Sequence, residues 1–224
     1  MRRIAACLSL ALSLSCTVAA KAADFSGVWL IRQPSALLRT DGHGPPPLLP
    51  AAARQYRDNL KAKAADKPLK DLTQCLPAGP VRVLWAPYPM MVLQTPNKIT
   101  LVHEYQHLLR HIYLNEPEPE PKPDDLDPTF MGTSTGRWQG DRLVVQTTGF
   151  NIQTTLDRSG LPHSDALRLV ETFQLIDKGR RLRDRITVID PKTYARPWST
   201  TAVFDRRPDL ELKEYLCRDD NRNG

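Results

Sequence analysis

The chain has 224 residues and a formal net charge of +6, and charged residues make up 25% of it. This length predicts one domain with a substantial core rather than several domains. The charge is modest and no basic run stands out, so nothing in the composition favours a nucleic acid or an anionic membrane surface as partner.

The first 22 residues have the form of an export signal. Met1-Arg2-Arg3 is basic, residues 4–20 are mostly apolar, and Ala20-Lys21-Ala22 resembles a cleavage site. The apolar run is too short and too interrupted for a membrane span. We therefore expect cleavage near Ala22 and a periplasmic or secreted protein of residues 23–224. Its net charge falls to +3, because the signal carries three basic residues and no acid. Lipidation at Cys16 is an open alternative.

The rest of the chain predicts mainly strands. Residues 25–31 form a first strand, and the Ala- and Lys-rich stretch over about 50–65 predicts one exposed helix. From about residue 81, short β-rich runs alternate with turn residues such as Pro96-Asn97. Strands joined by tight turns make an antiparallel meander. Eight or more of them in a small domain usually close up, so we predict an all-β antiparallel barrel.

Two cysteines, Cys75 and Cys217, remain once the signal is removed. An oxidising compartment allows them one intramolecular pairing, and we predict a disulfide between them. Two free buried thiols are the alternative.

The stretch from His103 to His107 reads H-E-Y-Q-H and matches the H-E-x-x-H pattern of zinc peptidases. On a helix the two histidines share one face and can bind one metal ion. On a strand they lie about 13 Å apart, too far to share a zinc that needs each nitrogen at about 2 Å. Tyr113 stands where one class of zinc peptidase has its third His. We therefore predict no metal site, and a zinc metallopeptidase is the least favoured function.

The connection over residues 150–166 is long for a meander, and long loops in compact domains tend to carry function. Asp157 and His163 could act there as an oriented acid/base pair, because His titrates near neutral pH. The alternative is turn chemistry, in which Asp157 caps the turn to Gly160 and Ser164 caps the next element.

The hairpin over residues 167–190 carries two acids on one face. A two-residue turn at Lys178-Gly179 sets a register that places Glu171 and Asp184 among leucine, isoleucine, valine and phenylalanine side chains. That face should be the inner one. A carboxylate there is costly unless it has a partner or a proton.

The partner of these inward acids is either structural or functional. An arginine such as Arg110 or Arg137 could form a buried salt bridge, and a ligand could take the same place. Tryptophans in such a barrel are core residues or the apolar wall of a pocket. We take as candidate ligand contacts Trp29, Trp138, Asp184 and Arg110.

Residues 131–171 resemble a large family of exported bacterial proteins of unassigned function. The resemblance lies in W-x-G-D-x-L-V-V from Trp138, T-x-x-F ending at Phe150, and L-D-x-x-G-x-P-H-S from Leu156. It implies no catalytic assignment. Gly27-Val28-Trp29 resembles the G-x-W of the first strand in lipocalins and related calycin barrels. That second resemblance implies a barrel with a ligand cavity at one mouth.

Two functions follow as hypotheses. The first is an exported binding protein with a small, partly apolar ligand inside the barrel. The second is a periplasmic lyase, isomerase or hydrolase in which Glu171, with His163 and Asp157, moves protons. Both predict a small-molecule ligand or substrate and neither needs a cofactor. The sequence leaves open whether the protein is an enzyme, and it leaves open its oligomeric state.

Overall fold

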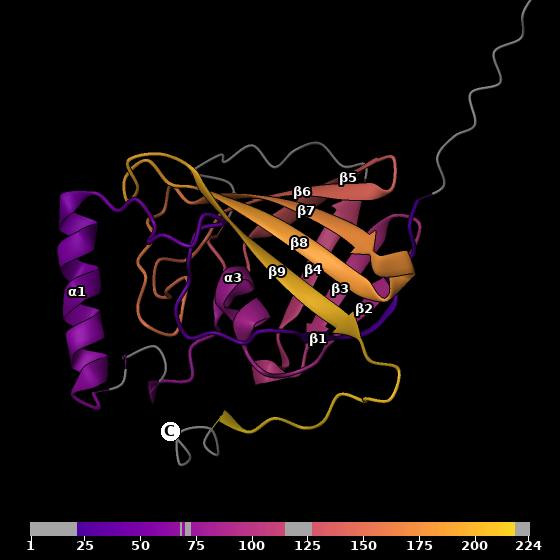
Figure 1. Cartoon of the computed structure of the whole chain (residues 1–224), viewed down its shortest axis with the longest axis horizontal. Helices are drawn as coiled ribbons and strands as arrows, with labels where there is room; N and C mark the ends of the chain where they lie inside the picture. Colours follow the sequence, from indigo (N-terminus) through magenta and orange to yellow (C-terminus); the bar gives the residue numbers. More distant parts are fainter. Residues whose placement is uncertain (1–21, 68, 70–72, 115–126, 218–224) are drawn as a thin grey trace, which may run out of the picture.

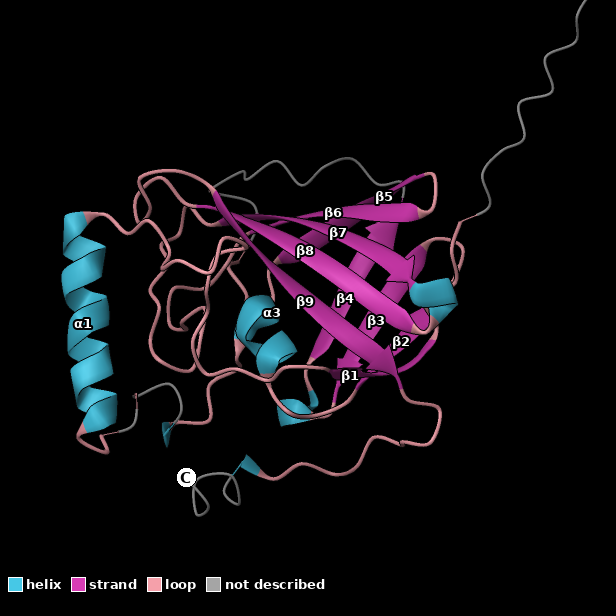
Figure 2. Ribbon diagram, in the orientation of Figure 1, coloured by secondary structure: helices cyan, strands magenta, loops and turns pink. Residues whose placement is uncertain are grey.

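The structure is a computed structural model, and it describes residues 22–67, 69, 73–114 and 127–217. Residues 1–21 of the predicted signal lie outside the described part. Nine strands form a closed barrel (Figures 1 and 2). They are β1 (Gly27–Ile31), β2 (Met90–Gln94), β3 (Lys98–His103), β4 (Leu109–Leu114), β5 (Thr133–Gln139), β6 (Arg142–Thr148), β7 (Arg168–Ile176), β8 (Arg181–Ile189) and β9 (Trp198–Arg206).

The barrel closes because β1 pairs with both β2 and β9, with Trp29 opposite Arg206 in the closing pair. The predicted all-β barrel is confirmed. One pair departs from the predicted meander, because β4 and β5 run parallel, with Ile112 opposite Ser134. A parallel pair cannot be joined by a tight turn and needs a crossover of a dozen or more residues. The intervening residues 115–132 are numerous enough for such a crossover.

Most strands bury alternate residues, because successive side chains point to opposite faces of a strand. On β4, for example, Arg110, Ile112 and Leu114 are buried, and the residues between them are exposed. The buried sets of the nine strands together fill the barrel with aliphatic and aromatic side chains.

The β7–β8 hairpin has the predicted register, with Glu171 opposite Ile186 and Leu175 opposite Leu182. The turn was predicted wrongly: it spans residues 177–180 rather than Lys178-Gly179 alone, and it includes the short helix η3 (Asp177–Gly179). The wider turn adds one residue on each side, so the pairing of the strands does not shift.

Helix α1 (Pro50–Ala64) confirms the predicted helix. Proline is favoured in the first turn of a helix, where its missing N–H is not needed, and alanine, lysine and arginine favour the helical interior. Tyr56 and Ala52 are its buried residues. In Figure 1 the helix lies to the left of the barrel, beyond the loops at that end. None of the helices in the described part of the chain has the length and hydrophobicity to traverse a bilayer.

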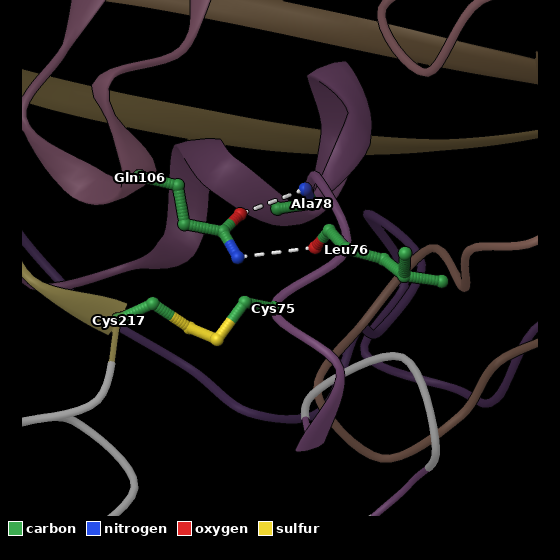
Figure 3. Close-up of a disulfide and its surroundings, with 5 residues drawn as sticks. All are labelled: Cys75, Leu76, Ala78, Gln106 and Cys217. Atoms are coloured by element: carbon green, nitrogen blue, oxygen red, sulfur yellow. Dashed lines mark hydrogen bonds between the residues drawn. A yellow bond between two sulfur atoms is a disulfide. The ribbon is translucent and has the colours of Figure 1, made fainter.

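The short helices α3 (Gly79–Arg82) and η1 (Val83–Trp85) are buried at every residue. Just before them, Cys75 forms the predicted disulfide with Cys217, with the Cα atoms 6.0 Å apart and a sequence separation of 142. Figure 3 shows Gln106 beside this bond. Its amide accepts the N–H of Ala78 at 2.9 Å and donates to the carbonyl of Leu76 at 3.0 Å.

Candidate functional site

The register of the β7–β8 hairpin places Glu171 and Asp184 inside the barrel, as predicted. Their exposed fractions are 1% and 0%. In β9, the residue opposite Asp184 is Ala202, and in β7 it is Phe173. Neither of these neighbours can form a side-chain hydrogen bond, so the carboxyl group of Asp184 depends on side chains from further across the barrel.

Arg110 reaches across the interior from β4 and forms a two-pronged ion pair with Glu171. Its Nη1 donates to Oε1 at 2.8 Å, and its Nη2 donates to Oε2. Nε donates to Ser134 Oγ at 3.1 Å, and Nη2 also donates to Thr147 Oγ1 at 2.8 Å. Burial lowers the pKa of Arg110, but the charge and hydrogen bonds of Glu171 outweigh it and raise the pKa above its ordinary value. The guanidinium is therefore fully charged.

Asp184 has no comparable partner. Within the described part of the chain, no N–H or O–H group donates to either of its carboxyl oxygens, so a hydrogen bond between Asp184 and Glu171 requires that one of the two acids hold a proton. Burial, the negative charge of Glu171 and a side-chain hydrogen bond with Glu171 raise the pKa of Asp184 well above its ordinary value, although Arg110 opposes that shift. The carboxyl group is therefore stabilised in its neutral, protonated form relative to an exposed aspartate.

His103 also belongs to the interior. It ends the inward-facing series of β3, is buried, and its Nε2 has no hydrogen-bond partner among the described residues. Burial, and secondarily the charge of Arg110, lowers the pKa of His103 to about 3, so the ring is neutral. Six polar residues, one from each of six consecutive strands, form what we call the interior polar cluster: His103, Arg110, Ser134, Thr147, Glu171 and Asp184.

A small apolar cavity of about 10 Å³ adjoins this cluster. Two of its wall residues, Leu101 and Phe173, are the cross-strand partners of Arg110 and Asp184. The cavity is lined by Phe25, Val92, Ile99, Leu101, Ile112, Leu143, Phe173 and Leu182. This volume is about that of a single water, so a larger molecule can enter only if a wall residue moves.

Trp29 and Trp138, the two tryptophans that the sequence suggested as ligand contacts, both contact Phe25, which lines this cavity. Trp138 lies 5.1 Å from the Phe25 ring, measured between ring centroids. Trp29 is fully buried, donates from Nε1 to the Phe25 carbonyl at 2.9 Å, and carries the Arg206 guanidinium 4.3 Å above its ring. Trp29 contacts Phe25 but is not among the residues that line this cavity.

His163 lies in the loop before β7, beside another cavity of about 10 Å³ that Arg82 and Thr154 also line. Its Nδ1 lies 3.0 Å from the Ser164 carbonyl, which can only accept, so Nδ1 carries the proton. Nε2 then accepts from Thr154 Oγ1 at 3.3 Å. Burial lowers the pKa of His163. The ring is thus neutral and held in one tautomer.

The predicted pairing of Asp157 with His163 is wrong. Both oxygens of Asp157 are taken by other donors: Oδ2 accepts from Leu38 N and Tyr56 Oη, and Oδ1 accepts from Ser159 N and Leu161 N. The turn chemistry is what the structure shows, and it also ties the loop to α1. Burial and the Asp157 charge raise the pKa of Tyr56.

The three predicted catalytic residues do not form a hydrogen-bonded group in the described part of the chain. Among the described residues, no hydrogen bond links any two of Glu171, His163 and Asp157, since each bonds to other groups. Ser164 caps the following segment as expected, with Oγ accepting the N–H of Ala166 at 3.1 Å.

The H-E-x-x-H stretch is a strand end followed by the short helix η2 (Tyr105–His107), so the strand interpretation is confirmed. His103 faces the interior, whereas His107 lies outside, where its Nε2 accepts the N–H of Tyr215 at 3.0 Å. Glu104 accepts the N–H of Lys213 at 2.7 Å. The motif thus holds the C-terminal segment against the barrel. No cluster of three or more potential metal ligands occurs in the described ranges.

Sequence reasoning missed three members of the interior polar cluster: His103 as an interior residue, Ser134 and Thr147. The available signal was the same alternation that located Glu171. Thr147, for instance, continues the inward series of Leu143 and Val145 on β6.

The fold and the site together define a closed nine-stranded barrel with a buried polar cluster. No family model matches the chain, and no curated protein matches it. Among solved structures, the chain matches one titled "Human cRBP IV", with 14% sequence identity over 82% of this chain and 98% of that chain, at a TM-score of 0.36. At that similarity, the description of the fold rests on this chain's own strand pairing, and any function must be argued from its own residues.

Proposed function

We propose that this protein is an exported binding protein for a small molecule that contacts the interior polar cluster. The observation that carries the proposal is the carboxyl group of Asp184, which is buried beside the Arg110–Glu171 ion pair and accepts no hydrogen bond from any described residue. A buried polar group left without a partner costs about 1–3 kcal/mol. Native proteins keep few such groups, and a functional role is one reason to keep one.

The remainder of the ligand would be apolar, because the cavity next to the cluster has apolar walls. Phe25 is a wall residue that precedes β1, so no strand pairing holds it. Its N–H donates to Gln94 Oε1 at 3.0 Å and its carbonyl accepts from Trp29 Nε1 at 2.9 Å. Displacing the Phe25 ring would enlarge the cavity.

Export is supported by the Cys75–Cys217 disulfide, because such bonds persist in oxidising compartments. It is also supported by the signal-like first 22 residues. An enzyme that uses Glu171, His163 and Asp157 has less support. Both oxygens of Glu171 accept from Arg110, and Asp157 serves four structural donors.

Native mass spectrometry of the protein purified from the organism that makes it tests this proposal. We expect a small molecule to be retained by the wild type and lost in Asp184→Leu. Asp165→Leu, at an exposed acid, is the control and should retain it. If the wild type carries no molecule, and a thermal-shift screen of sugars, aromatics and lipids gives no stabilisation, the protein does not bind a ligand in its interior.

A further inference from the structure

The charges inside the barrel are unequal in number. The interior polar cluster contains two carboxyl groups, from Glu171 and Asp184, and one guanidinium, from Arg110. Glu171 takes that guanidinium as its partner. His103 is neutral, and the two remaining members, Ser134 and Thr147, are hydroxyls. The cluster therefore holds one acid more than it has cations, and that acid is Asp184.

Four of the five N–H groups of Arg110 already donate to other groups of the cluster. Its Nε donates to Ser134, and its two terminal nitrogens donate to Glu171 and Thr147. An anionic ligand would find no uncommitted cation here and would meet two acids. A cationic ligand would instead give each carboxylate its own positive partner, which is the arrangement that makes a buried charge tolerable.

We propose that the interior site selects small molecules that carry one protonated amino group, with the carboxylate of Asp184 as its counterion. This inference rests on the proposed function and names its ligand class. An ammonium group has only donors, which matches a carboxylate that has only acceptors. The adjoining apolar walls, including Phe25 and Phe173, would receive the hydrocarbon part of the amine.

The proposal predicts that binding of an amine releases a proton, which makes the affinity depend on pH. Because burial and Glu171 raise the pKa of Asp184 in the ligand-free protein, its carboxyl group is protonated over a wider pH range than usual. An ammonium ligand favours the carboxylate, so that proton leaves to solvent as the amine binds. At pH values below the pKa that Asp184 has in the ligand-free protein, the affinity for an amine should then increase by up to about tenfold for each unit by which the pH is raised. A neutral alcohol that accepts a hydrogen bond from the protonated acid should show the opposite slope above that pKa.

The test is isothermal titration calorimetry of the mature protein with trios of compounds, each an amine, an alcohol and a carboxylate that share one hydrocarbon group. The three hydrocarbon groups are butyl, phenylmethyl and naphthylmethyl. The expected result is that amines bind at least about tenfold more tightly than their partners, a difference of about 1.4 kcal/mol. Titrations in buffers of different ionisation enthalpy should show about one proton released per bound amine, provided that the pH is low enough for Asp184 to be protonated before the amine binds. Asp184→Asn should lose at least tenfold in amine affinity, and Asp165→Asn should lose none.

Each other outcome is decisive. Amine binding that is unchanged in Asp184→Asn, with the variant's fold checked by circular dichroism and its urea midpoint, overturns the counterion role. Preferential binding of alcohols or carboxylates overturns the ligand class and leaves the proposed binding function standing. If no member of the trios binds while native mass spectrometry finds a retained molecule, the amine class is wrong. If neither experiment finds a ligand, the proposed function is wrong.

Discussion

Two buried aspartates of this protein have opposite surroundings. The exposed fractions of Asp157 and Asp184 are 2% and 0%, so both side chains are buried. Asp157 receives four hydrogen bonds, each of 2.9–3.0 Å, whereas Asp184 receives none from the described residues. The difference lies in the backbone around each one.

Asp157 lies in a loop, where backbone N–H groups are not used by a strand ladder and can turn toward a carboxylate. Three of its four donors are such groups, from Leu38, Ser159 and Leu161. Asp184 lies in β8, whose backbone pairs with β7 and β9 along its length. In a strand of that kind an inward acid can be satisfied only by side chains or by a ligand. Asp157 is therefore explained by the fold, and Asp184 is not.

Removing the cation of the interior should have the largest effect. Arg110→Met leaves Glu171 and Asp184 buried without a positive partner, and we expect a loss of about 3–5 kcal/mol in the free energy of unfolding. Urea denaturation followed by tryptophan fluorescence measures it. Arg185→Met, which breaks an exposed pair with Asp41, should cost no more than about 1 kcal/mol. Equal costs for the two variants would mean that the interior is open to water.

Removing the satisfied acid comes next. Asp157→Ala leaves up to four donors without their acceptor, and we expect a loss of about 2–4 kcal/mol in the free energy of unfolding. Tyr56→Phe, which removes a single one of these bonds, should cost about 1 kcal/mol. A loss below 1 kcal/mol for Asp157→Ala would show that water replaces the carboxylate, and the contrast between the two aspartates would disappear.

Acid should destabilise the interior through His103. Its pKa is lowered to about 3 in the folded protein, against about 6.5 for an unfolded His. The folded state therefore binds fewer protons in this window, and stability falls by up to about 1.4 kcal/mol per pH unit as pH drops from 6.5 toward 3. The unfolding free energy of the wild type, compared with His103→Leu over this range, isolates the effect. Parallel curves would place the imidazole in contact with water.

Replacing the unsatisfied acid should have the smallest effect, and the opposite sign. In the ligand-free protein at pH 7, Asp184→Leu should gain about 1–2 kcal/mol in unfolding free energy, because the variant removes a buried acid to which no described group donates. Asp184 has a raised folded-state pKa. The wild type should therefore lose stability relative to the variant as pH rises from about 3.9, the unfolded value, through the folded value. A loss of stability in Asp184→Leu would reveal a structural partner and remove the basis of the proposed function.

Some features of this protein follow from local pattern alone. The alternation of apolar residues over 167–190 predicted the β7–β8 register and both inward acids, because a strand's side-chain period of two is a property of the strand itself. The helix at Pro50–Ala64 and the pairing of Cys75 with Cys217 were predicted on similarly local or compositional grounds. The same pattern could not predict the parallel pairing of β4 with β5, because a crossover depends on the whole sheet.

The sequence by itself determined that this chain forms a barrel and that Glu171 and Asp184 face inward. Only the tertiary structure decided which acid is satisfied. Arg110 is 61 residues from Glu171 in sequence, and Tyr56 is 101 from Asp157. Such partners meet only when the barrel closes and the loops pack on it, because they lie on separate elements of the fold. In the finished barrel Arg110 serves Glu171, and no donor among the described residues reaches the carboxyl oxygens of Asp184.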